Sequence, residues 1–197
     1  VSVKYLTTEI YRIVFEKNVT NDFAGGNGSA EDPYIIANAD QLSLVSKNLD
    51  ACYKLINDID FEGMSYIYTL GSTDASYNGT FDGNGHTISN IEIRSSLQDE
   101  TNVTMAPSTG LFGSIGKEGV VQNLTLKNVT VKALASEDGI GLENDNSYFN
   151  VGIIAGVNGG KIANCTISGS SSLKFDRTKS KSSNRCLEVR VGGITGQ

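Results

Sequence analysis

The chain has 197 residues, which is enough for a single domain with a substantial core. Its 22 glycines and only 2 prolines, with no tryptophan, favour a turn-rich all-β protein. A formal net charge of −6 argues against a nucleic-acid partner and against an anionic membrane surface. No apolar run approaches the length of a membrane span.

Residues 1–22 do not share the pattern of the rest of the chain. Tyr11, Ile13 and Phe15 alternate with polar residues, which predicts a strand. We interpret this segment as an N-terminal strand or cap, or as the remnant of a preceding segment. Residues 23–197 then form the main domain.

A short strand and a helix are expected near the start of the main domain. The apolar stretch 34–36 predicts the strand, and Asn38 followed by Gln41 resembles a capping box. Apolar residues then recur at helical spacing at Leu42, Val45 and Leu49. The helix, at about 39–49, would cover the first coil of a repeat, because an open solenoid end exposes core and unpaired strand edges.

One short pattern then recurs along the chain, and such repetition is the strongest signal in the sequence. It consists of an apolar residue, a spacer, an Asn, an apolar residue, a spacer and an apolar residue, at 86–93, 120–126 and 161–167. A fourth copy, LINDIDF, carries Asp in place of Asn. The residues at the Asn position are Asp58, Asn90, Asn123 and Asn164.

The repeat predicts a bend at each Asn. Side chains alternate along a strand, so apolar residues at i, i+3 and i+5 cannot all face inward on a straight strand. Asn tolerates the left-handed conformation that a corner requires. Corners stacked in successive coils would place Asp58, Asn90, Asn123 and Asn164 in one ladder, in a parallel solenoid with coils roughly 4.8 Å apart.

A Gly-rich apolar strand precedes each Asn motif, at 79–83, 110–113 and 152–156. A further copy, at 192–196, ends the chain with no Asn motif after it. We therefore expect the natural protein to continue beyond this point. The edge left by the last copy is expected to fray or to self-associate, because an unpaired apolar strand is a pairing site.

These segments together carry a family resemblance over about residues 23–197. They read, in order, FAGGNGSAEDPYII, LINDIDFEG, YNGTFDGNGHTISNI, TGLFGSI, VQNLTL, VGIIAGVNGGKIANCTISG and VGGITG. In this order they resemble the GLUG-motif proteins, which are bacterial secreted or surface proteins. The same modules are similar to the region ahead of the catalytic domain in IgA-specific metallopeptidases, and to filamentous adhesins.

The resemblance implies a fold and a location. The fold would be all-β: a right-handed parallel β-helix with a short N-terminal capping helix and long loops at one corner. The location would be extracellular or at the bacterial cell surface, with a role in cell adhesion.

Three long polar insertions, at 94–108, 132–149 and 171–187, follow the Asn-motif strands and should emerge on the same side. Acidic residues gather in the second insertion and basic residues in the third. These candidate ligand-binding residues are Glu137, Asp138, Glu143, Asp145, Lys174, Arg177, Lys179, Lys181 and Arg185. They are either surface loops with scattered charge or a composite binding surface.

The sequence offers little for catalysis. His86 is the only histidine, so neither a zinc site with two histidines nor a convincing Ser-His-Asp triad can be built. Asp58, Asp60, Asp74 and Asp82 are the carboxylates near the coils, and Asp58 and Asp82 have structural explanations in the ladder and a turn. We predict no catalytic residue, no cofactor and no metal site.

The three cysteines cannot all pair with one another. Cys165 replaces an aliphatic residue in an inward column, so it is expected to be a buried free thiol. Cys52 and Cys186 are far apart in coil order, and we do not expect a disulfide between them.

Two functions from different classes fit these observations. The first is a non-catalytic module of the cell surface or secreted medium, adhesin-like, that binds a host, matrix or glycan ligand through stacked loops. The alternative is a carbohydrate-active β-helix enzyme or an accessory region of a secreted peptidase, which would require clustered carboxylates on one groove or a catalytic site outside this chain.

Overall fold

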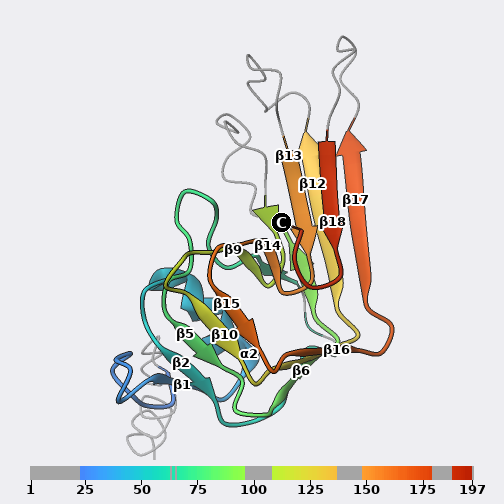
Figure 1. Cartoon of the computed structure of the whole chain (residues 1–197). Helices are drawn as coiled ribbons and strands as arrows, with labels where there is room; N and C mark the ends of the chain where they lie inside the picture. The colour runs from blue at the N-terminus through green and yellow to red at the C-terminus, as the bar shows by residue number, and fades with distance from the viewer. Residues whose placement is uncertain are drawn as a thin grey trace, which may run out of the picture.

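The computed structural model describes residues 23–62, 64, 66–95, 108–136, 148–178 and 188–196. The segment 1–22, with its predicted strand, lies outside these residues. In the described part the chain is mostly β, and its sheets are built from parallel pairs of strands. Short strands separated by corners, rather than hairpins, carry the chain forward (Figure 1).

The strands fall into four successive sets, which we call rungs 1 to 4. Before them come β1 (Tyr34–Ile36), α2 (Ala39–Ser43) and the 3₁₀ helix η1 (Leu44–Lys47). Rung 1 contains β2 (Tyr53–Leu55), β3 (Ile59–Asp60) and β4 (Ile67–Tyr68). Rung 2 contains β5 (Thr80–Asp82), β6 (Thr87–Ser89), β7 (Glu92–Arg94), β8 (Ser108–Thr109) and β9 (Phe112–Ile115). Rung 3 contains β10 (Val120–Gln122), β11 (Thr125–Lys127), β12 (Thr130–Ser136), β13 (Tyr148–Gly152) and β14 (Ala155–Asn158). Rung 4 contains β15 (Lys161–Ala163), β16 (Thr166–Ser168), β17 (Ser172–Thr178) and β18 (Glu188–Gly192).

Each strand of rung 2 pairs with the strand at the same place in rung 3, and β10 to β13 of rung 3 pair in turn with β15 to β18 of rung 4. The resulting sheets run β1-β2-β5-β10-β15, β3-β6-β11-β16, β4-β7-β12-β17, β8-β13-β18 and β9-β14. Consecutive strands of the chain therefore belong to different sheets, and residues about forty positions apart become neighbours. The parallel pairing of corresponding strands agrees with the repeat of the sequence.

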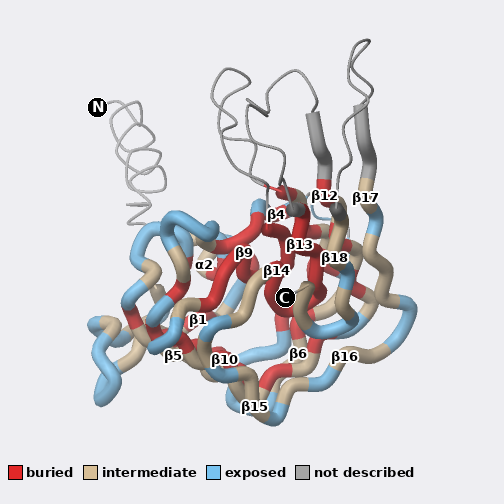
Figure 2. Tube along the Cα trace, turned by 45° about the horizontal axis from the view of Figure 1, so that its top comes forward, coloured by how far each residue is buried: buried red, intermediate tan, exposed pale blue. Residues whose placement is uncertain are grey.

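The core consists of columns of apolar side chains that point inward from successive rungs. In one column Ile59 pairs with Ile88, Ile88 with Leu126, and Leu126 with Ile167. Ile88 and Leu126 are completely buried, and burying each such side chain contributes about 1.5–3 kcal/mol. Figure 2 shows that the buried residues run through the inner strands, among them β9, β13 and β14.

Asn residues turn the corners, as predicted, and they do so in the left-handed conformation. Asn123 and Asn128 have φ values of 54° and 53°, and Asn164 and Gly169 have φ values of 52° and 67°. Rungs 3 and 4 thus each have two left-handed corners five residues apart. Only Gly and a few short polar residues adopt this conformation readily.

The prediction of one Asn ladder is wrong, because there are two ladders at two corners. In the first, Asn123 Nδ2 donates to Asp82 Oδ1 at 3.0 Å, and Asn164 Nδ2 donates to Asn123 Oδ1 at 3.2 Å. Asn90 is not part of it. Asp58 is in neither ladder: its carboxylate accepts from the Thr87 N–H at 2.9 Å.

The second ladder contains Asp60, Asn90 and Asn128. Asn90 Nδ2 donates to Asp60 Oδ1 at 2.8 Å, and Asn128 Nδ2 donates to Asn90 Oδ1 at 3.0 Å. The backbone N–H of Ser170 donates to Asn128 Oδ1 at 2.9 Å and extends the column into rung 4. The predicted register of the Asn positions was wrong because rung 3 contains the Asn motif twice, and Asn90 corresponds to the second copy.

The Gly-rich stretches, which the sequence pattern placed in one column, belong to two different sheets. The stretch 79–83 contains β5, whose Phe81 pairs with Val121 of β10. The stretches 110–113 and 152–156 contribute to β9 and β14, which pair with each other. The final copy, 192–196, pairs with this second group as predicted, because Gly192 lies beside Gly152 and Thr195 bridges to Ala155.

The predicted cap at the N-terminal end of the stack is confirmed in outline. Asn38 Oδ1 accepts from the Gln41 N–H at 3.0 Å, and Gln41 Oε1 accepts from the Ala37 N–H at 2.7 Å. The helix is shorter than predicted, because residues 44–47 tighten into 3₁₀ geometry. Leu42 and Val45 are completely buried against rung 1.

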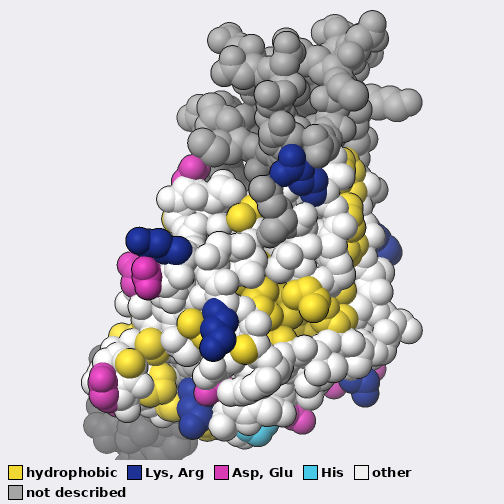
Figure 3. Space-filling view, in the orientation of Figure 1, with side chains coloured by type: hydrophobic (Ala, Val, Ile, Leu, Met, Phe, Trp, Pro, Cys, Tyr) yellow, Lys and Arg dark blue, Asp and Glu magenta, His cyan; other side chains and the backbone are white. Residues whose placement is uncertain are grey.

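Rung 4 is less buried than rungs 2 and 3. Its inward apolar residues pack against the core but keep partial exposure: Ile162, Cys165, Ile167, Leu173 and Phe175. Figure 3 shows hydrophobic side chains gathered on the face toward the viewer, where rung 4 lies in Figure 1. Val191 and Ile194 add exposed fractions of 58% and 50%.

Cys165 lies in the inward column as predicted, but it is half-buried rather than buried. Its thiol donates to the Ala163 carbonyl at 3.3 Å, and burial raises its pKa. Cys52 is also a free thiol, whereas Cys186 lies outside the described residues.

Candidate binding surface

The outer face of the sheet β4-β7-β12-β17 gathers aromatic and charged side chains in register. Side chains alternate across a strand, so the buried column Ile67, Ile93 and Val131 leaves its flanking residues facing outward. One outward column contains Tyr68, Arg94, Lys132 and Lys174. The column two residues earlier contains Glu92, Thr130 and Ser172, and Tyr66 directly precedes β4 on the same side. We call these two columns the outer β4–β17 face.

The aromatic end of this face is in rung 1. The Arg94 guanidinium carbon lies 3.5 Å from the centroid of the Tyr66 ring, which is cation–π geometry. The Tyr66 and Tyr68 rings meet edge to face with centroids 5.4 Å apart, and a hydrogen bond with Tyr66 raises the pKa of Tyr68. Tyr68 remains 53% exposed, so a planar aromatic surface is available to a ligand.

The charged part of the face is centred on Glu92. Its carboxylate pairs with Arg94 at 2.7 Å and with Lys132 at 2.5 Å. The hydrogen bond from Lys132 is the main cause that lowers the pKa of Glu92. One carboxylate therefore offsets the charges of two neighbouring cations and holds Arg94 in place over Tyr66.

Lys174 continues the column of cations on β17, where it pairs in register with Lys132. Its side chain is exposed, and it makes no ion pair within the described part of the chain. Among the predicted ligand-binding residues, Lys174 is the one whose side chain the structure describes. Neighbouring strands are about 4.8 Å apart, so Lys132 and Lys174 place two like charges side by side.

The other predicted ligand-binding residues are not described. Arg177 belongs to β17, but its side chain falls outside the description. The remaining ones lie wholly outside the described residues: Glu137, Asp138, Glu143, Asp145, Lys179, Lys181 and Arg185.

The boundaries of the insertions differ from those predicted. β12 extends to Ser136 and β17 to Thr178, because the two strands pair over seven residues and continue the sheet into the predicted loops. The strands before the three insertions all belong to the β4-β7-β12-β17 sheet, and those after them to the β8-β13-β18 sheet. The ends of the insertions are thus attached to the same two sheets, which lie side by side in Figures 1 and 2.

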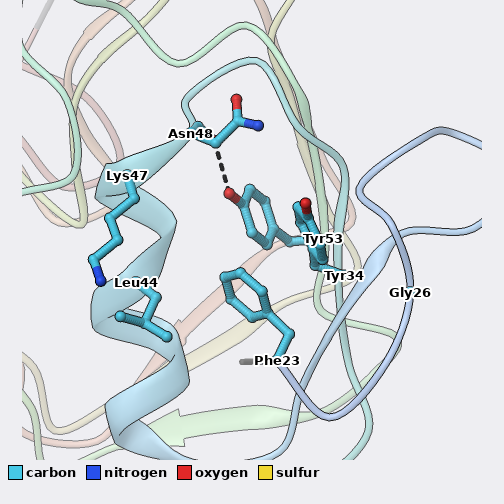
Figure 4. Close-up of a pocket in the computed structure, with 7 residues that line it drawn as sticks. All are labelled: Phe23, Gly26, Tyr34, Leu44, Lys47, Asn48 and Tyr53. Atoms are coloured by element: carbon cyan, nitrogen blue, oxygen red, sulfur yellow. Dashed lines mark hydrogen bonds between the residues drawn. The ribbon is translucent and has the colours of Figure 1, made fainter. Parts of the chain in front are cut away.

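A small cleft of about 300 Å³ lies between η1 and strands β1 and β2 (Figure 4). Three aromatic rings line it. The Phe23 ring stacks on the Tyr34 ring with centroids 4.6 Å apart, and its centroid lies 5.3 Å from that of Tyr53. The Tyr53 hydroxyl donates to the Asn48 carbonyl at 2.7 Å, and burial raises the pKa of Tyr53. The lining contains Lys47 but neither a carboxylate nor a histidine, and its three rings could contact a small apolar group.

The carboxylates and the histidine of the turns have structural partners. His86 Nδ1 lies 3.1 Å from Asp58 Oδ1 at a corner, where the Asp58 side chain is exposed and the His86 side chain is partly buried. Asp82 Oδ1 accepts from the Asn84 N–H at 2.7 Å within its turn. No group of three metal-binding side chains occurs among the described residues.

In comparisons with known proteins, this chain is similar to short parts of long proteins. No protein-family profile matches it. It is 33% identical over 163 residues to halomucin of Haloquadratum walsbyi, covering 77% of this chain and 2% of halomucin. It is 32% identical over 133 residues to a protein of Evansella cellulosilytica described as a Gly-rich membrane protein, covering 64% of this chain and 14% of that protein. The chain thus spans a small fraction of the length of the curated relatives that it matches.

One crystal structure is similar over most of the chain. It is of a protein from Bacteroides ovatus described as an immunoglobulin A1 protease, with 21% sequence identity and a TM-score of 0.47. The similar region covers 86% of this chain and 67% of that one. In the described part of the present structure, no helix is both long and apolar enough to cross a membrane.

Proposed function

We propose that this chain is a non-catalytic, adhesin-like module of an extracellular or cell-surface protein, and that it binds its ligand through the three insertions. The carrying observation is the common attachment of all three insertions to the β4-β7-β12-β17 and β8-β13-β18 sheets. Insertions that recur at one place in a repeat fold are frequent binding elements. The name halomucin and the description of the second relative as a membrane protein support the location.

The proposed architecture is a right-handed parallel β-helix of the GLUG type over residues 23–197. The five-strand period of the sheet order and the two Asn ladders support a regular winding of the chain. Side-chain hydrogen bonds between rungs at the two ladder corners would make such a stack a rigid scaffold. Such rigidity suits a module that holds loops at a fixed spacing.

Replacing each insertion separately with a Gly-Ser linker tests the binding role. The replaced segments would be 96–107, 137–147 and 179–187, so that the described strands stay intact. Each variant would be compared with the parent chain on an array of host and plant glycans and matrix proteins. Binding lost in at least one replacement, with an unchanged melting temperature, supports the proposal. Binding that survives all three replacements removes the insertions from the site.

Catalysis is the alternative, and the same array separates it. The partnered turn carboxylates Asp58 and Asp82 argue against a glycosidase, which needs two carboxyl groups facing one cleft. Incubated glycans would be analysed for new reducing ends and for unsaturated products. Cleavage by the purified chain would show that it is a carbohydrate-active enzyme rather than a binding module.

The exposed apolar residues of rung 4 suggest self-association as a second property. Ile167 and Phe175 are only partly buried, and Val191 and Ile194 are at least half exposed. Covering such an apolar face with a second copy would remove it from water. Analytical ultracentrifugation should show dimers that Ile194→Asp weakens. A chain that remains monomeric at high concentration would contradict this.

A further inference from the structure

We infer that the outer β4–β17 face binds an acidic polysaccharide, with a sugar ring against Tyr68 and carboxylate groups along the cations Arg94, Lys132 and Lys174. This inference rests on the proposed function only for its setting outside the cell. It assigns a site on the strands themselves, separate from the three insertions. It also names the chemistry of the ligand.

The cation column is the first argument. Arg94, Lys132 and Lys174 occupy consecutive strands in register, and like charges directly opposite each other destabilise a sheet. Glu92 offsets the first pair through its two ion pairs. Among the side chains that the structure describes, the Lys132–Lys174 pair has no carboxylate partner other than Glu92, which already binds Lys132. A ligand with regularly spaced negative charges would offset the remaining repulsion.

The aromatic end of the column is the second argument. Tyr66 is held on one side by Arg94 and meets Tyr68 edge to face, so both rings are fixed before a ligand arrives. Fixed rings lose little conformational entropy on binding. The apolar faces of pyranose rings pack against such exposed tyrosines. A surface that binds anions by charge alone does not require tyrosine rings, whereas a site for charged sugars uses both the cations and the rings.

The dimensions of the face suit a chain rather than a single small anion. From Tyr68 to Lys174 there are three strand steps, or about 14 Å at 4.8 Å each. A linear saccharide of a few units spans this distance. The column runs along the stacking direction of the rungs, so one polysaccharide would cross four strands.

The opposite reading is that Lys174 only protects a sheet edge. Lysine on an edge strand discourages pairing with other chains, and β17 is the last strand of its sheet. That role needs a charge on β17 but does not need the tyrosines of β4. The two readings therefore differ in what a change at Tyr68 does.

The test measures binding of the full 197-residue chain to three polymers by calorimetry at low salt. The probes are polygalacturonate, neutral dextran and polyglutamate of matched charge. Lys174→Gln removes a column cation, and Lys161→Gln removes an exposed lysine of the same rung from a different sheet. Tyr68→Ala removes the ring, whereas Tyr68→Phe keeps the ring and removes only the hydroxyl.

Polygalacturonate should bind, and dextran should not. Lys174→Gln should weaken binding up to about fivefold, the most that one exposed ion pair supplies, while Lys161→Gln leaves it unchanged. Tyr68→Ala should weaken it about fivefold or more, and Tyr68→Phe should have little effect. Binding should weaken further at 1 M salt, where the screening length falls to about 3 Å. Circular dichroism melting of each variant confirms that it is folded.

Two results would overturn the inference. Polyglutamate bound as tightly as polygalacturonate, with no effect of Tyr68→Ala, would identify a general charge patch open to acidic peptides. The absence of binding to polygalacturonate by the folded chain would exclude the ligand class. Neither result bears on the insertion replacements, whose outcome decides the proposed function separately.

Discussion

Rungs 2 and 4 place the same kind of residue at the same position, but in different surroundings. Ile88 and Ile167 belong to one inward column and are separated by Leu126. Ile88 is completely buried, whereas Ile167 keeps partial exposure. The repeat sequence therefore determines which way a side chain points, but the neighbouring rungs determine how much that side chain contributes to stability.

The strongest test of this difference is a matched pair of truncations. Ile88→Ala should lower the free energy of unfolding by about 2–5 kcal/mol, because it leaves a cavity in a closed core. Ile167→Ala should cost roughly half as much, because part of its surface already contacts water. Urea unfolding of both variants measures the two losses.

Equal losses in the two variants would contradict the comparison. They would mean that Ile167 is covered in solution as fully as Ile88. Repeating the measurement at a tenfold lower protein concentration distinguishes a covering second copy, since only that contribution depends on concentration.

The corners allow a similar comparison between two glycines with left-handed φ. Gly85 has a φ of 82° and open space around its missing side chain, whereas at Gly169, with a φ of 67°, a Cβ would collide with the Asn128 side-chain amide. Gly85→Ala should cost about 1 kcal/mol from backbone conformation alone. Gly169→Ala should cost roughly 2–3 kcal/mol, since the collision adds to the strain.

Thermal unfolding of these two variants gives the comparison directly. The order of the two melting temperatures is the critical result. A Gly85→Ala variant less stable than Gly169→Ala would show that the second ladder does not hold Asn128 where the structure places it.

The two ladders also show which parts of the fold the sequence could predict. The Asn corners, the capping residues Asn38 and Gln41 and the stacked rungs follow from local chemistry and repetition. The register does not, because VVQNLTLKNVTV contains Asn123 and Asn128 in equivalent apolar settings. Rung 2 adds two residues in the turn between Asp82 and Thr87, relative to the same turn in rung 3, which hides the correct match.

The outer β4–β17 face was missed for the same reason. Tyr68, Arg94, Lys132 and Lys174 are far apart in the sequence, and only the correct register brings them into one column. The charges of the insertions, in contrast, are adjacent in the sequence. A signal was nevertheless present in the alternation of Tyr66, Ile67 and Tyr68, where an aromatic residue stands on each outward position.

Asn90, at the centre of the second ladder, should contribute more to stability than Asn164, at the end of the first ladder. Asn90 both donates to Asp60 and accepts from Asn128, whereas Asn164 only donates, to Asn123. Asn90→Gly keeps the left-handed corner but removes both bonds, and it should cost about 1–2 kcal/mol. Asn164→Gly should cost less than about 1 kcal/mol. Urea unfolding of both variants tests this order, and Asn90→Ala, which also strains the backbone, should be worse than Asn90→Gly.

The smallest expected effect is a pH dependence confined to the rung 1 end of the second ladder. The hydrogen bond from Asn90 is the main cause that lowers the pKa of Asp60 below its ordinary value of 3.8. A carboxyl group with a lowered folded-state pKa stabilises the fold above its unfolded pKa, and this contribution is lost as the pH falls through the folded value. Stability from this group should therefore be constant from pH 7 to 5 and decline only below about pH 4.

NMR titration should show the pKa of Asp60 returning toward 3.8 in Asn90→Gly. The pKa of Asp58 is lowered chiefly by the Thr87 N–H, so it should not move in the same variant. A joint shift of both carboxyl groups would mean that the substitution had disturbed rung 1 as a whole, and an unmoved Asp60 would mean that the ladder bond does not persist in solution.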